Sequence, residues 1–243
     1  MILWTATARA TVVLLSDDPQ QRVSQLAIAL SDPTTTNTGI TALPYNNYIN
    51  LTGASTSASI AGNLTADAFR LTFSQARSAG VTGYGQSQFL VYLSVTEPTT
   101  YALSGRFAVT NDAGKSSALS YGIDIYDANT SGTSTQYLYH EVQYSAKTPN
   151  ASFDLGGALT GDGMATRTAN SFVLLPSHVY AINATFFLGE SGFSFPITAA
   201  TATGNMTITF TAPEPGGVLG YAGLAGTLLL RVRRRRAAAL GAV

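Results

Sequence analysis

The sequence predicts an all-β chain folded as an antiparallel β-sandwich with a jelly-roll-like organisation. Apolar and polar residues alternate along many short segments, which is the pattern of strands that bury one face. Clusters of Gly, Pro, Asn, Asp and Ser, such as 111–117 and 127–134, separate these segments. Helical periodicity is scarce, so at least eight short strands joined by turns favour a sandwich over a mixed fold.

The N-terminal segment, 1–30, is set apart from the body because its structure can be read in two ways. A helix would start with Asp18 as its N-cap and Pro19 in its first turn, but the same residues also allow a strand. The segment also lacks a recognisable signal peptide, because Arg9 interrupts the apolar run that such a signal requires. If the chain is exported, we expect either a start upstream of Met1 or an atypical signal.

The body, predicted as residues 31–211, contains several files of alternating apolar residues that we expect to face the core. In chain order the files are Phe69, Leu71 and Phe73; Phe89, Val91, Leu93 and Val95; Tyr101, Leu103, Phe107 and Val109; Tyr121, Ile123 and Ile125; Leu138, His140, Val142 and Tyr144; Tyr180, Ile182, Ala184, Phe186 and Leu188; and Met206, Ile208 and Phe210. In this assignment His140 is a core histidine.

Charge and cysteine content exclude several classes of function. The chain has 13 basic and 13 acidic residues, but five arginines lie beyond residue 230, which leaves the rest with 8 basic against 13 acidic residues and a net charge of −5. An acidic body argues against nucleic acid as a partner. The absence of cysteine excludes disulfides, thiolate metal sites and cysteine nucleophiles.

No catalytic set can be recognised in the sequence, so we expect no enzyme activity and no cofactor. His140 and His178 lie 38 residues apart without a zinc-binding helix pattern, and no nucleophile-elbow motif is present. Asp124 and Glu141 could face each other on neighbouring strands, but sequence does not set the separation on which glycoside hydrolysis depends. A surface hydrolase therefore remains a disfavoured alternative.

The turn at 127–132 has a weak resemblance to a calcium-binding loop. Asp127, Asn129 and Ser131 follow the spacing of the first ligands in such loops. However, the twelfth position, where a bidentate acid is required, is Leu138. The loop is either a calcium site or an ordinary hairpin turn, and the second reading is preferred.

A row of polar and aromatic residues in the segment 137–145 suggests sugar binding. On a strand, Tyr137, Tyr139, Glu141 and Gln143 would share the face opposite the apolar file. Aromatic rings beside polar groups are what stacking on a pyranose ring requires. Because tyrosine is also a common strand residue, the row could instead only stiffen a sheet.

The C-terminal tail combines three features in a fixed order. Pro213, Glu214 and Pro215 end the last strand, and residues 216–230 carry no charge. As a helix those 15 residues would span roughly 22 Å, short of a hydrocarbon core of about 30 Å. The basic cluster that comes next should stay on the cytoplasmic side; it consists of Arg231, Arg233, Arg234, Arg235 and Arg236.

Residues 212–236 therefore resemble the PEP-CTERM sorting signal of exported bacterial proteins. The resemblance implies transient anchoring in the inner membrane, processing by an exosortase, and a final place at the cell surface or in an exopolysaccharide matrix. It covers only the tail, so it says nothing about the role of the body. A plain membrane anchor and a buried terminal helix are the two alternatives for the tail. For the body, we expect a non-enzymatic surface or extracellular-matrix protein without a specified role, and a carbohydrate-binding surface module is the alternative.

Overall fold

A computed structural model describes residues 12–15, 23–31, 35–79, 84–111, 118–129, 136–145, 150–159, 164–189 and 199–212. Within these ranges the regular structure is entirely β-strand. The strands are β1 Val12–Leu14, β2 Gln25–Leu30, β3 Thr35–Gly39, β4 Tyr45–Thr52, β5 Thr56–Leu64, β6 Ala68–Arg77, β7 Gly85–Val95, β8 Thr99–Asn111, β9 Ala118–Asp127, β10 Tyr137–Ser145, β11 Asn150–Asp154, β12 Met164–Ala169, β13 Val173–Leu174, β14 Tyr180–Gly189 and β15 Ala200–Thr211. The described residues contain no helix that could cross a membrane.

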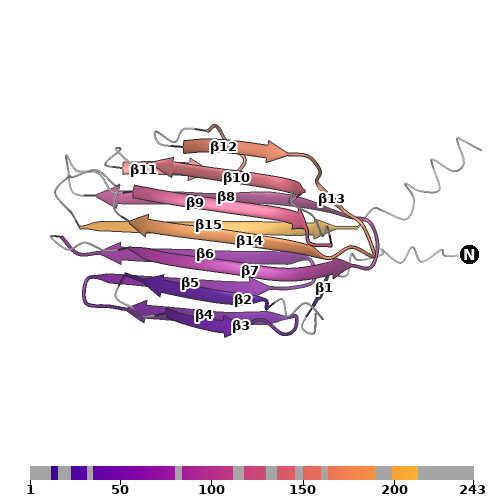
Figure 1. Cartoon of the computed structure of the whole chain (residues 1–243), viewed down its shortest axis with the longest axis horizontal. Helices are drawn as coiled ribbons and strands as arrows, with labels where there is room; N and C mark the ends of the chain where they lie inside the picture. Colours follow the sequence, from indigo (N-terminus) through magenta and orange to yellow (C-terminus); the bar gives the residue numbers. More distant parts are fainter. Residues whose placement is uncertain are drawn as a thin grey trace, which may run out of the picture.

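The strands form two antiparallel sheets that pack against each other, which confirms the predicted sandwich. Sheet A has the strand order β12-β10-β9-β14-β7-β2-β3, with β1 added beside β7. Sheet B has the order β11-β8-β15-β6-β5-β4, with β13 added beside β8. Figure 1 looks through both layers, whose strands run along the long axis of the molecule. The two broad faces of the sandwich are therefore the outer sides of sheets A and B.

A single hydrophobic cluster fills the space between the sheets. Most of the predicted apolar files point into it: Phe69 and Phe89 are fully buried, and their rings meet edge to face at 6.0 Å. Phe186 and Phe107 come from opposite sheets and pack at 5.6 Å between ring centroids. Aromatic pairs of this kind add about 0.5–1.5 kcal/mol each beyond the area they bury.

The N-terminal segment differs from one of its two predicted structures. The stretch Gln25–Leu30 is strand β2, so there the strand reading is confirmed and the helix reading is wrong; Asp18 and Pro19 lie outside the described residues. Leu26, Ile28 and Leu30 alternate into the core, which a helix could not achieve at this spacing. Because β1 and β2 both belong to sheet A, the sandwich begins upstream of the predicted boundary at residue 31. The tail from Pro213 onward lies outside the described residues.

Candidate functional site

Strand β10 presents its side chains in the opposite phase to the prediction. Tyr139, Glu141 and Gln143 point inward, with at most 2% of each residue exposed, whereas His140 lies on the outer side of sheet A. A register shift between Tyr137 and Tyr139 marks a β-bulge. A bulge adds one residue to a strand and re-aims its side chains. It places Tyr137 opposite Tyr126 on the outer side, with 37% of the residue exposed. The predicted row is therefore not a surface row: Tyr139, Glu141 and Gln143 are buried, and Tyr137 is the member that reaches the surface.

The inward residues form a polar cluster around the carboxylate of Glu141. Arg167 on β12 binds it with two bonds, from Nε to Oε2 at 2.9 Å and from Nη2 to Oε1 at 3.0 Å. The hydroxyl of Tyr121 donates to Oε1 at 2.5 Å, and that of Tyr139 donates to Oε2. Gln143 Nε2 and the backbone N–H of Gly156 donate at 3.1 and 3.0 Å. Both carboxylate oxygens are thus saturated by protein donors.

This saturation fixes the charge of Glu141. Burial by itself raises the pKa of a carboxyl group, but hydrogen bonds from Arg167, Tyr121 and Tyr139 outweigh burial and lower the pKa of Glu141 to about 2. The same contacts act on the partners: burial and the bond to Glu141 raise the pKa of Tyr121 above its ordinary range. A carboxylate that stays ionised and has no free lone pair is suited to holding strands together rather than to transferring protons.

The geometry also separates the two carboxylates that could have formed a hydrolase pair. Asp124 lies opposite His140 in the β9–β10 register, whereas Glu141 lies opposite Ile123. Successive residues of a strand point to opposite faces, so Asp124 is on the outer side of sheet A and Glu141 is in the interior. Asp124 and Glu141 therefore do not face each other as predicted, because the strand partner of Asp124 is His140, one residue before Glu141.

The outer side of sheet A is built from rows of residues that run across its strands. One row joins Tyr92 on β7, Ala181 on β14, Tyr126 on β9 and Tyr137 on β10. The next row joins Leu90, Asn183, Asp124, His140 and Thr168. An aromatic row therefore lies directly beside a polar one. We call these two rows, together with Gln88, the outer face.

Polar groups on the outer face are bonded to one another and still face solvent. His140 Nδ1 lies 2.6 Å from Asp124 Oδ1, and the side chains are 28% and 25% exposed. Among the described residues, no further hydrogen bond reaches His140 Nε2 or Asp124 Oδ2. Gln88 Nε2 donates to Asn183 Oδ1 at 2.9 Å. His140 is thus not the core histidine that the apolar file predicts; it is a surface group held in place by an acid.

Aromatic rings stand next to this pair. The Tyr137 ring packs against His140 with 5.0 Å between centroids, and against Tyr126 edge to face at 6.2 Å. Partial burial, followed by the neighbouring Tyr92, raises the pKa of Tyr126 to about 12. Tyr126 therefore keeps its proton as a hydrogen-bond donor at any ordinary pH. The outer face offers an exposed ring, an imidazole nitrogen and carboxylate and amide groups within one surface.

Of the predicted calcium ligands, Asp127 has both carboxylate oxygens engaged with protein groups. Asp127 Oδ1 accepts the backbone N–H of Asn129 at 2.9 Å, and Oδ2 lies 2.5 Å from His178 Nδ1. The first contact is the local bond by which an aspartate shapes a turn. Ser131 lies outside the described residues. Within the described ranges, no group of three or more His, Cys, Asp or Glu could hold a metal ion.

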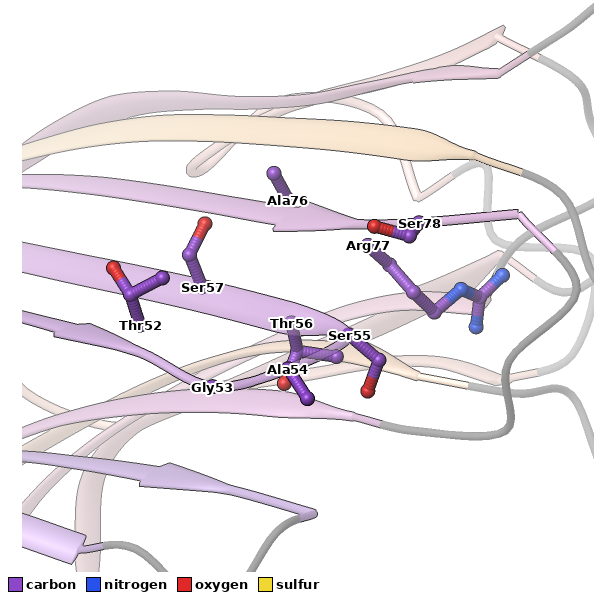
Figure 2. A pocket seen from close by; sticks show the side chains of 9 residues that line it. All are labelled: Thr52, Gly53, Ala54, Ser55, Thr56, Ser57, Ala76, Arg77 and Ser78. Carbon is purple, nitrogen blue, oxygen red and sulfur yellow. The ribbon is translucent and has the colours of Figure 1, made fainter.

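A separate pocket of about 310 Å³ opens at one end of sheet B (Figure 2). The β4–β5 turn and the end of β6 form it, and its lining consists of Thr52, Gly53, Ala54, Ser55, Thr56, Ser57, Ala76, Arg77 and Ser78. Its lining is rich in hydroxyl groups around one arginine, and contains neither a carboxylate nor an aromatic ring. It thus lacks both the ring for sugar stacking and the acid pair for hydrolysis.

Comparisons with known proteins assign no family to this chain. No family model matches the chain, and no curated protein matches it. Among solved structures it is similar to a family 11 carbohydrate-binding module from Clostridium thermocellum, in complex with a β-1,3-1,4-mixed-linked tetrasaccharide, at 12% identity and a TM-score of 0.26. That match covers 79% of this chain and 99% of the module. An infectious bursal disease virus structure, Gx strain, matches at 8% identity and a TM-score of 0.28, over 86% of this chain and 56% of that one. These TM-scores are too low to support an argument about either fold or function.

Sequence reasoning misses most of the outer face and also the arginine partner of the buried Glu141. The local pattern gives no reason to join Asp124 to His140, and it assigns no role to Tyr126 or Arg167. One signal is available: a glutamate and a glutamine in alternation with tyrosine, followed by an isolated arginine on a later strand, is compatible with a buried ion pair. Buried charges need a partner, so Arg167 is what makes the inward phase of β10 possible.

Proposed function

We propose that the chain is an exported, non-enzymatic surface protein whose sandwich binds polysaccharide on the outer face. The observation that carries this proposal is the exposed Tyr137 ring beside the Asp124–His140 pair. A pyranose ring presents an apolar face edged with hydroxyl groups. Tyr137 supplies a surface for the apolar face, and the pair supplies a donor or acceptor nitrogen and a carboxylate oxygen for the hydroxyls.

The charge of the outer face favours a neutral glycan over an acidic one. Asp124 is its carboxylate, and the described outward residues of β7, β9, β10 and β14 include no lysine or arginine. A uronic acid or sulfated polymer would meet the Asp124 carboxylate, and no lysine or arginine lies on the described part of this face to attract it. We therefore expect neutral polysaccharide to be the ligand class.

Affinity electrophoresis through gels that contain a single polysaccharide tests this part of the proposal. The chain should be retarded by at least one neutral polymer, such as a β-glucan or a mannan, and should migrate freely through polygalacturonate or alginate gels. Retardation by acidic polymers alone would contradict the expected preference for neutral glycans. Free migration in every gel, with the native fold intact by circular dichroism, would remove the glycan-binding role.

The tail gives the proposed location of this function. The tail acts as the signal that anchors the chain in the inner membrane and presents it to an exosortase. Its three parts are the motif Pro213 to Pro215, the uncharged stretch 216–230 and the arginine cluster. Release at the surface would then place a glycan-binding body in the exopolysaccharide that the tag implies. No catalytic step is assigned to the body, because protein donors saturate the Glu141 carboxylate and Asp124 lies on the opposite side of sheet A from it.

Mass spectrometry of the C-terminus from the native host tests the sorting step separately. Loss of the residues after about Pro215 is the expected result, and replacement of Glu214 by Ala should keep the tail on the chain. A mature protein that retains Arg231 and the rest of the cluster would instead indicate a permanent anchor.

A further inference from the structure

Three large apolar side chains are exposed around the short strand β13. Phe172, Val173 and Leu175 are 45%, 39% and 47% exposed, while Leu174 between them is fully buried. Phe172 is held from one side by Tyr101, at 5.5 Å between ring centroids. Isolated exposed apolar residues are ordinary, but a contiguous group usually contacts something. We refer to Phe172, Val173 and Leu175 as the apolar tip.

The chain leaves the described sandwich beside the apolar tip. Val173 and Thr211 both pair with Thr100, from opposite sides of β8. Because neighbouring strands are spaced about 4.8 Å apart, their Cα atoms lie roughly 10 Å from each other. The hydroxyl of Thr100 donates to the carbonyl of Thr211 at 3.1 Å, which fixes the end of β15 at this point. Figure 1 shows β13 and the end of β15 at the same end of the molecule.

The distance from this exit to the apolar stretch of the tail is short. Three residues, Pro213 to Pro215, separate Ala212 from the uncharged stretch that begins at Gly216. Even fully extended, the connection from Ala212 to Gly216 reaches no more than about 14 Å. The headgroup layer on each side of a bilayer is about 6 Å thick. If the stretch enters the hydrocarbon core, the end of the sandwich that carries the apolar tip is therefore held close to the lipid surface.

We propose that the apolar tip rests in the interfacial layer of the outward-facing leaflet while the tail is intact; this inference depends on the proposed anchoring of the tail. An acidic residue, Glu97, lies close to the tip: Thr99 pairs with Leu174, and its hydroxyl donates to the backbone carbonyl of Glu97 at 2.8 Å. The tip itself carries no cation, so its chemistry fits an uncharged lipid surface. Contact through apolar side chains, without attraction to anionic headgroups, is expected. Cleavage of the tail would then release the body from the membrane, because the apolar tip would no longer be held at the lipid surface.

Site-directed labelling tests the proposal on the full chain, which contains no natural cysteine. Leu175→Cys carries an environment-sensitive fluorophore, and Met164→Cys is the matched control, since Met164 is 51% exposed at the other end of the sandwich. Each labelled chain is reconstituted into phosphatidylcholine vesicles and floated. Val173→Cys replaces Leu175→Cys if the latter lowers the melting temperature.

The expected result is a label at position 175 that loses about half of its emission or more to brominated lipid and little to iodide in the water. The label at position 164 should show the reverse. Floating chains whose position 175 is quenched by iodide would overturn the tip proposal and leave the anchoring intact. Protection from both quenchers would also overturn it, because protein would then cover the tip. Chains that fail to float would refute the anchoring, and the tip proposal with it.

Discussion

The two sides of sheet A near β10 carry similar side chains, but the inner side uses them for stability and the outer side leaves them open to solvent. Inside, tyrosines, an amide and the Glu141–Arg167 pair form one closed network in which every carboxylate lone pair has a donor. Outside, tyrosines, amides and the Asp124–His140 pair form contacts that leave part of each group open to water. The inner pair holds the edge strand β12 and the turn at Gly156 to the sheet, whereas the outer pair remains available for a ligand.

This difference separates stability from binding within one strand. Changes to the inner network should lower the free energy of unfolding and leave a folded outer face able to bind. Changes to the outer face should affect binding and leave the free energy of unfolding nearly unchanged. The inner side is therefore where substitutions should alter stability most.

The largest effect is expected when one member of the buried ion pair is removed. Arg167→Met leaves the Glu141 carboxylate buried without its charged partner, which typically costs about 3–5 kcal/mol. The double variant Glu141→Leu/Arg167→Met should recover much of that loss, because neither charge then has to be buried. Urea denaturation of both variants measures the difference. A double variant no more stable than Arg167→Met would show that the pair is not the source of the cost.

A second effect is a loss of stability in acid. The folded-state pKa of Glu141, about 2, lies below its ordinary value of 4.5. The carboxylate therefore contributes its full stabilisation above about pH 4.5, and this contribution is lost as the pH falls towards 2. Across that window it amounts to about 3 kcal/mol. Thermal unfolding at a series of pH values should show a steeper slope for the natural chain than for Glu141→Gln.

A smaller effect is expected at Gly156, which presents its N–H to Glu141. Its φ of 76° lies in the left-handed region, and an added Cβ would meet no atom within 4 Å. Gly156→Ala should therefore cost about 1 kcal/mol through backbone conformation alone. Gly39→Ala is the matched control, since a Cβ there also meets no atom within 4 Å and the backbone has no positive φ. Equal melting temperatures for the two variants would contradict this explanation.

The outer face should show the smallest effects on stability. Tyr137→Ala and His140→Ala alter partly exposed side chains, so each should change the free energy of unfolding by no more than about 0.5 kcal/mol. Differential scanning calorimetry measures this change. A loss as large as that of Arg167→Met would mean that the outer pair is structural as well, and the contrast between the two sides would disappear.

The sequence predicts the sandwich well because its apolar files follow a period of two. Phe69, Phe89 and Ile123 are buried as their files require. The same rule fails on β10, where either set of alternating residues is chemically able to face inward. Leu138 and Val142 favour one phase, but Arg167 and the bulge at Tyr137 decide for the other. Both determinants are long-range or irregular, so they are not contained in the local pattern. The outer face escapes prediction for the same reason.

Glycan binding by the outer face is tested most directly by the affinity of its variants for a neutral polysaccharide that retards the natural chain. Isothermal titration should show that Tyr137→Ala and His140→Ala each weaken binding roughly tenfold or more, the effect of losing about 1.4 kcal/mol. Tyr48→Ala should bind as the natural chain does, because Tyr48 is 61% exposed but lies on β4 at the edge of sheet B. Equal affinities for all four proteins, or a loss confined to Tyr48→Ala, would contradict the assignment of glycan binding to the outer face.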